Sequence, residues 1–173
     1  FGVFRYDRKN DRAEEIAFDP QRGLPVNDVT AMAACSDSTL WVGTGYGITC
    51  YDGATGKEKP TPRYGNELLR SGVIHEIIAD TLDNLWVSTN AGIVRYTPAT
   101  NRSVSYDSSY GLDVVEFSDG ASFYDRHTGR LFFGGNNGFV VVSGAQQPAA
   151  AESESYKPPI LFRNLLIGGK EYS

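Results

Sequence analysis

The sequence predicts an all-β chain that forms part of a β-propeller, and three observations favour this fold class. First, a segment that begins Leu-Trp-Val and ends in Gly-Ile-x-x-Tyr returns at a fixed spacing, since Trp86 follows Trp41 by 45 residues. Second, each unit contains four short strand-like segments, and a period of this length with four strands per unit is typical of propeller blades. Third, 19 glycines, 10 tyrosines and 9 phenylalanines favour short strands joined by tight turns.

The repeat keeps its phase along most of the chain. The best copies, Leu40–Tyr51 and Leu85–Tyr96, agree at the Trp, Gly and Tyr positions. A looser copy, Leu131–Val142, has Phe132 in place of Trp, and a partial copy, Gly2–Tyr6, opens the chain. Four copies in phase indicate a repeated structural unit.

Each complete unit is predicted to contain four strands in the same order. In one unit we expect Val29–Cys35, Leu40–Thr44, Gly47–Tyr51 and a weaker polar strand near Lys57–Tyr64. In the next we expect Val73–Ala79, Leu85–Thr89, Gly92–Tyr96 and Ser103–Tyr106. Asn-Ala-Gly at 90–92 and Asn-Asn-Gly at 136–138 supply residues that tolerate positive φ, as two-residue hairpin turns require.

The apolar second strands indicate how the units pack. Strands such as Leu-Trp-Val at 40–42 are apolar without strict alternation, as expected for a sheet covered on both faces. One blade alone cannot bury a Trp, whereas radial stacking can. A four-stranded β-sandwich is the alternative, and it would pair the strands into two facing layers. Residues 1–143 then hold about three blades, so we expect either an open arc or completion by another segment or chain.

The composition changes after Val142. Residues 144–157 are rich in Ala, Ser, Glu and Gln, which is typical of a linker. Residues 158–173 contain the apolar run Ile160–Ile167 followed by Gly-Gly, which predicts the first strands of a second β-domain.

The unit Leu-Trp-Val-Gly-Thr, two turn residues and Gly-Ile-x-x-Tyr resembles the two-component regulator propeller repeat. The Pro-Pro-Ile at 158–160 resembles the start of the three-tyrosine immunoglobulin-like domain that follows such propellers. The resemblance implies a periplasmic, ligand-sensing fragment of a hybrid two-component histidine kinase, which recognises a polysaccharide-derived oligosaccharide and signals across the membrane. It further implies remaining blades of a parent propeller, and we expect a homodimer in the intact receptor.

Charge and reactive residues limit the other functions. A net charge of -5 without a basic cluster disfavours nucleic acid as a partner. His75 and His127 have no companion at metal-ligand spacing, and Cys35 and Cys50 are separated by an intervening strand, too far for a disulfide. We therefore expect buried thiols and predict no catalytic residue, metal or cofactor in this fragment.

Strand alternation places the fourth-to-first and second-to-third connections of the blades on one face of the propeller. Aromatic side chains can stack on the apolar faces of sugar rings, and neighbouring amide and charged side chains can form hydrogen bonds with sugar hydroxyls. The ligand-binding candidates are Tyr46, Tyr64, Asn66, Arg70, His75, Asn90, Tyr110, Asp113, Asn136 and Asn137. Two alternatives remain: a propeller enzyme (a lyase or a glycan-cleaving enzyme), for which the inner strands offer only His75, Glu76 and Glu116, and a protein-interaction scaffold.

Overall fold

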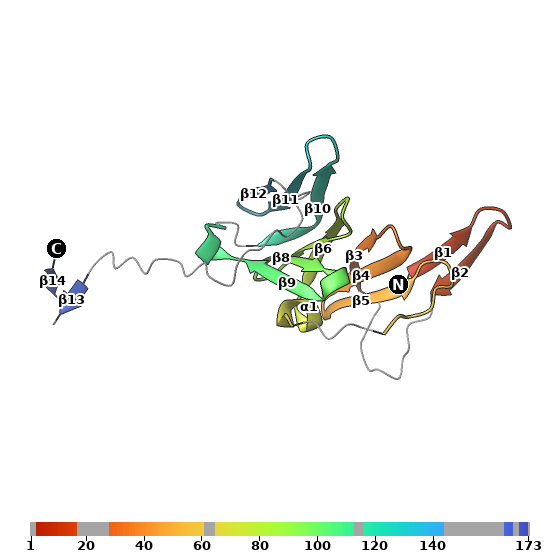
Figure 1. Cartoon of the computed structure of the whole chain (residues 1–173), viewed down its shortest axis with the longest axis horizontal. Coiled ribbons are helices and arrows are strands. Elements are labelled where there is room, and N and C mark those ends of the chain that lie inside the picture. Colours follow the sequence, from red (N-terminus) through yellow and green to blue (C-terminus); the bar gives the residue numbers. More distant parts are fainter. Residues whose placement is uncertain are drawn as a thin grey trace.

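The computed structural model is built mainly of antiparallel strands, as the sequence predicts (Figure 1). It describes residues 3–16, 28–60, 65–112, 116–143, 165–167 and 170–172. Within these residues each sheet consists of strands that follow one another in the sequence. Each repeat unit therefore folds as a local sheet.

The strands follow the predicted order closely. The opening hairpin pairs β1 (Val3–Asp7) with β2 (Arg12–Ile16). The next sheet contains β3 (Val29–Ala34), β4 (Thr39–Thr44) and β5 (Gly47–Asp52). The third contains β6 (Ile74–Ala79), β7 (Leu85–Thr89), β8 (Gly92–Thr97) and β9 (Arg102–Tyr106). The fourth contains β10 (Phe117–Asp125), β11 (Arg130–Gly135) and β12 (Gly138–Val142).

The register of the second and third strands is the same in every complete copy. The paired residues are Leu40 with Tyr51, Leu85 with Tyr96, and Leu131 with Val142. These positions are also related by the repeat spacing of 45 and 46 residues in the sequence. The repeat is therefore structural as well as sequential.

The first strands of the three larger sheets lie together. β3 packs against β6, β6 packs against β10, and β10 also reaches β3 (Figure 1). Two facing layers would not bring the first strands of three sheets to one place, so the sandwich alternative does not describe this fold. The fold is a partial β-propeller, with β3, β6 and β10 as the inner strands.

Two apolar clusters hold the three larger sheets together. One joins Trp41 and Cys50 of the β3–β5 sheet to Leu85 and Val87 of the next sheet. The other joins Trp86 of that sheet to the β10–β12 sheet. Trp41 and Trp86 are each only 3% exposed. Radial stacking therefore buries both indoles, as the sequence predicts.

Hairpin turns are present at both predicted places, but positive φ occurs only at their glycines, Gly92 and Gly138 (142°), and not at the asparagines before them. Gly47 and Gly92 open β5 and β8 with φ of 102° and 125°. A Cβ at Gly92 would lie 2.2 Å from the Tyr106 carbonyl oxygen, so both backbone conformation and space require glycine there. The glycine-rich 43–47 segment forms the end of β4 and the turn into β5.

Two elements differ from the sequence prediction. The fourth strand expected near Lys57–Tyr64 is reduced to an isolated bridge between Tyr51 and Glu58 in the described part of that segment. A short helix, α1 (Glu67–Ser71), occupies the connection to β6, where the sequence suggested only a loop. The helix begins at Asn66, whose side chain accepts a hydrogen bond from the Leu68 N–H.

Both cysteines are free, as predicted, with Cys50 buried and Cys35 half-buried. Near the chain end, β13 (Leu165–Ile167) pairs with β14 (Lys170–Tyr172), so the predicted new strands are present. The predicted linker, 144–157, lies outside the described residues. The proposed domain boundaries at residues 143 and 158 remain predictions.

Candidate functional site

The connections at one end of the sheets form what we call the loop face: the β4–β5, β7–β8 and β11–β12 turns and the segments that lead into β6 and β10. A Cβ at Gly47 would lie 2.6 Å from the backbone of Arg70, so α1 rests on the β4–β5 turn. The Asn90 N–H donates to the Val73 carbonyl at 3.3 Å, and the Asn136 N–H donates to the Glu116 carbonyl at 3.0 Å. The loop face is therefore held by backbone contacts.

The inner strands carry a polar ring where they approach the loop face. We call Thr30, His75 and Asp119 the axial collar. Each lies at an irregularity in the pairing of its strand with the next, and β-bulges of this kind re-aim side chains. Thr30 Oγ1 donates to the Ile74 carbonyl at 2.5 Å, and His75 Nδ1 lies 2.7 Å from Asp119 Oδ1. Each contact links one blade to the next.

The contact with Asp119 gives His75 a defined orientation. The His75 side chain is 15% exposed and that of Asp119 is 63% exposed, so the pair lies at the boundary between the core and solvent. Because a carboxylate only accepts hydrogen bonds, Nδ1 carries the hydrogen, and in the neutral ring Nε2 is then an acceptor. The pair can therefore accept hydrogen bonds from ligand hydroxyls at two places.

Asn66 and Arg70, both predicted to bind ligand, have structural partners. The Asn66 amide oxygen caps α1, and its Nδ2 donates to Ser105 Oγ at 2.6 Å. Asn66 thus fastens the helix to β9. Arg70 forms an exposed ion pair with Glu67 at 2.6 Å. Both residues lie on the loop face, and the sequence did not reveal these contacts.

Tyr110 stands at the end of an aromatic row. Its ring lies edge-on to Tyr106 at 5.5 Å, and Tyr106 stacks on Trp86 at 5.9 Å. Arg95 covers the Trp86 ring, with its guanidinium carbon 5.6 Å from the ring centre. Tyr110 itself is 62% exposed. Tyr110 thus presents an exposed ring that is supported, through Tyr106, by the buried Trp86. Such a ring is suited to stacking against a ligand.

The remaining candidates are distributed over the loop face. Tyr46 is 52% exposed in the β4–β5 turn, and Asn90 and Asn137 are exposed in the equivalent turns. Asn136 Nδ2 donates to Glu116 Oε2 at 2.6 Å. The candidates thus fall into separate groups on one face. Tyr64 and Asp113 lie outside the described residues.

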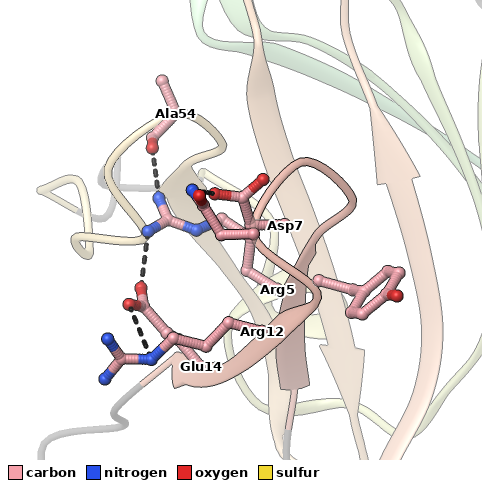
Figure 2. A pocket seen from close by; sticks show the side chains of 7 residues that line it. Arg5, Asp7, Arg12, Glu14 and Ala54 are labelled. Carbon is pink, nitrogen blue, oxygen red and sulfur yellow. Dashed lines mark hydrogen bonds and ion pairs between the residues drawn. The ribbon is translucent and has the colours of Figure 1, made fainter.

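A hollow that the sequence did not predict lies beside the β1–β2 hairpin (Figure 2). It encloses about 500 Å³ and is lined mainly by charged and amide side chains. Arg5 bridges Glu14, at 2.7 Å, and the Ala54 carbonyl of the neighbouring sheet, while Arg12 lies 3.8 Å from Glu14. In the sequence, the alternating charges along β1 and β2 are the feature that could have indicated this hollow. These charges are paired with one another, so they fix the hairpin against the next sheet.

Metal-binding and reactive groups are sparse in the part of the chain that the structure describes. Those residues contain no group of three or more His, Cys, Asp or Glu side chains placed to hold a metal ion. Burial is the main cause that raises the pKa of Cys35 and of Cys50 to about 11, so both thiols stay protonated near neutral pH. Among the described residues, no helix has the length and apolar character to cross a membrane.

Proteins of known sequence or structure resemble this propeller segment. No protein-family model matches the chain. Over 94 residues, 54% of its length, the chain is 30% identical to histidine kinase P4 of Formosa agariphila. The match spans 6% of that kinase.

Solved structures agree with this likeness. The extracellular domain of BT3049 from B. thetaiotaomicron, described as a hybrid two-component system, matches 83% of the chain with a TM-score of 0.67 and 25% identity. The extracellular domain of BT4673 from the same organism matches 85% with a TM-score of 0.60 and 23% identity, which supports the fold alone. The chain covers 19% of each of these structures. Both of these structural neighbours are extracellular domains of proteins described as hybrid two-component systems.

Proposed function

We propose that this chain is a segment of the extracytoplasmic, ligand-sensing region of a hybrid two-component histidine kinase. The observation that carries the proposal is the likeness to the BT3049 extracellular domain over 83% of the chain. The match to histidine kinase P4 supports the same class. The segment senses the ligand and transmits the signal, and catalysis belongs to other parts of the parent protein.

The ligand in this proposal is an oligosaccharide released from a polysaccharide, bound at the loop face. Exposed rings at Tyr46 and Tyr110 offer stacking surfaces for sugar rings. The axial collar offers acceptors for hydroxyls at His75 and Asp119. The loop face thus combines the two kinds of contact that a neutral, polyhydroxylated ligand needs.

The parent protein in this proposal is a periplasmic sensor with a membrane anchor. Remaining blades complete the propeller, residues 158–173 begin the three-tyrosine immunoglobulin-like domain, and the intact receptor is a homodimer. The specific repeat and domain names rest on the sequence resemblance alone.

The test is calorimetric titration of the parent ectodomain with a panel of polysaccharide-derived oligosaccharides. A ligand that binds should lose roughly two- to tenfold in affinity on Tyr110→Ala, because a stacked ring contributes about 0.5–1.5 kcal/mol. Tyr6→Ala is the matched control, since Tyr6 is 58% exposed and lies on the β1–β2 hairpin, away from the loop face.

Two outcomes would contradict the proposal. Equal losses for Tyr110→Ala and Tyr6→Ala would remove the loop face as the site. Recovery of cleaved sugar after incubation would favour the propeller enzyme instead, with His75 and Asp119 as the groups to replace next.

A further inference from the structure

The end of the blades that holds the loop face and the axial collar is acidic. In the described part of the chain, carboxylates lie there on Asp28, Glu67, Asp107, Glu116 and Asp119. Among the described residues at that end, Arg70 is the single lysine or arginine, and its ion pair with Glu67 at 2.6 Å balances its charge. The opposite end mixes both signs, as in the β1–β2 turn with Arg8, Lys9 and Asp11. The loop face therefore carries a field of one sign.

Two of these carboxylates are held in place by partners without charge. Glu116 Oε2 accepts a hydrogen bond from Asn136 Nδ2 at 2.6 Å, and the Glu116 carbonyl accepts from the Asn136 N–H at 3.0 Å. Asp119 Oδ1 lies 2.7 Å from His75 Nδ1, where an imidazole in its neutral form can donate. An amide or a neutral imidazole fixes the carboxylate but leaves its negative charge in place.

Asp107 adds a further fixed anion beside the β7–β8 turn. A Cβ at Gly92 would lie 3.3 Å from the Asp107 Cα, so the two segments are in contact. The Ser109 hydroxyl and the Ser109 N–H both donate to Asp107 Oδ1, at 2.5 and 2.9 Å. These hydrogen bonds lower the pKa of the Asp107 carboxyl group, so it remains ionised near neutral pH.

Hydrogen-bond chemistry points the same way as charge. A carboxylate only accepts hydrogen bonds, so Glu116 and Asp119 offer acceptors to a ligand. A uronate or sulfate group on the ligand also only accepts, and it would meet like charge without a donor. A hydroxyl or an ammonium group donates and would be satisfied there. Both arguments therefore disfavour an anionic ligand.

We propose that the loop face selects its oligosaccharide by charge. Glu116 and Asp119 exclude sugars that carry carboxylate or sulfate groups, and they accept hydrogen bonds from the hydroxyl or ammonium groups of neutral and amino sugars. This selectivity rests on the proposed function, in which the loop face binds the oligosaccharide. It adds the class of sugar and the residues that determine it.

Oligosaccharides that differ only in charge test the selectivity on the parent ectodomain. Calorimetric titration compares neutral xylan- and mannan-derived oligosaccharides, chitosan-derived amino sugars, and galacturonan-derived uronates with their neutral methyl esters. Each neutral oligosaccharide that binds is then titrated with one hydroxymethyl group oxidised to a carboxylate. The oxidised form should bind roughly tenfold more weakly or worse, because of like-charge repulsion and unpaired acceptors. Added salt should reduce this ratio.

Glu116→Gln should reduce the ratio of the two affinities by roughly threefold, because it removes a charge and keeps an oxygen for Asn136. Asp83→Asn is the matched control. It changes the net charge equally, but position 83 lies in the β6–β7 turn at the opposite end of the blades, so the ratio should not change. A general loss of binding or folding affects both affinities and cancels in the ratio.

Thiol reactivity gives a readout that needs no sugar. Ala91, in the β7–β8 turn, and Ala99, in the β8–β9 connection, are exposed at opposite ends of one blade. Ala91→Cys and Ala99→Cys are each treated with dithionitrobenzoate, an anionic disulfide, and with dithiodipyridine, a neutral one. The anionic-to-neutral rate ratio should be roughly threefold lower at position 91, and the difference should vanish at high salt. Cys35 and Cys50 react slowly near neutral pH, because burial raises their pKa to about 11.

Contrary outcomes separate this selectivity from the proposed function. Equal rate ratios at positions 91 and 99 would overturn the acidic field. A uronate that binds as tightly as its neutral counterpart would overturn the selectivity and leave the sensor proposal standing, since a sugar still binds. Binding of a uronate only after addition of Ca²⁺ would make the carboxylates ligands of a cation and overturn it too. If no oligosaccharide binds although the rate ratios differ, the proposed function fails, and the selectivity for sugars fails with it.

Discussion

Asp80 holds the turn between β6 and β7 through its carboxylate. It accepts hydrogen bonds from the N–H groups of Leu82 and Asn84, each at 2.9 Å, and from the Trp86 indole N–H at 3.0 Å. Asp80 is only 4% exposed. The preceding unit has Cys35 at the equivalent position, and the Trp41 indole nitrogen there has no hydrogen-bond partner among the described residues.

Asp80→Ala should lower the free energy of unfolding by about 3 kcal/mol, because it leaves a buried indole N–H and turn amides without acceptors. Cys35→Ala is the matched control and should lower it by about 1 kcal/mol, because it removes a half-buried thiol with its packing and its weak side-chain interaction with Asp83. Urea unfolding followed by Trp fluorescence measures both. Equal losses would show that the carboxylate contributes nothing beyond its volume.

At this scale the sequence predicted what depends on local chain geometry. The sequence places residues 80–84 between two predicted strands and His75 on an inner strand beside Glu76, and both predictions agree with the structure. The partner of His75 was not predicted. Asp119 lies 44 residues away and reaches His75 only because β10 is irregular before Ser122. Spacing in the sequence contains no signal for such a contact.

The turns that join strands reuse one five-residue arrangement. In Asp52–Gly56 and Asp125–Gly129, the aspartate accepts from the Thr hydroxyl and backbone N–H three residues later. These hydrogen bonds lower the pKa of both carboxyl groups. The closing glycines have φ of 69° and 67°. Both turns thus combine a carboxylate anchor with a left-handed glycine.

Gly56→Ala should destabilise the protein by about 1 kcal/mol, because a Cβ disfavours the left-handed conformation. Gly45→Ala is the control, since φ there is not positive and a Cβ would meet nothing within 4 Å. Thermal unfolding of the two variants should differ by a few degrees. An unchanged midpoint for Gly56→Ala would mean that the turn relaxes without loss.

Among the elements, the second and third strands of each unit were predicted in every copy, whereas the outer strand was predicted correctly at β9 but not beside Tyr51. The second strands β4 and β7 are buried almost throughout, so their residues are mostly apolar, and burial leaves a clear pattern. The outermost strand has a neighbour on one side only, and β9 is exposed or half-buried throughout. Its sequence is therefore weakly constrained, and beside Tyr51 it is reduced to a bridge. Helix α1 is too short for a periodic signal.

The molecule as a whole behaves as a short one-dimensional array. Each sheet contacts chiefly the one before and the one after it. In such arrays, stability depends on the number of neighbours that each unit has. The β6–β9 sheet has a neighbour on both faces, and every residue of β7 is buried. The β10–β12 sheet has one neighbour, and β12 is partly exposed along its length.

Amide hydrogen exchange should therefore be slowest in β7 and β8 and faster by at least tenfold in β12, because strands with one covered face open through smaller local unfolding events. Mass spectrometry of peptides from the native chain resolves the three strands. A measurement at two protein concentrations serves as control, since self-association through the exposed face of β12, which carries Phe139 and Val141, would slow exchange in β12 only at the higher concentration. Equal protection of β12 and β7 at low concentration would contradict the array description. It would mean that the terminal sheet is stabilised by contacts that do not follow the order of the blades.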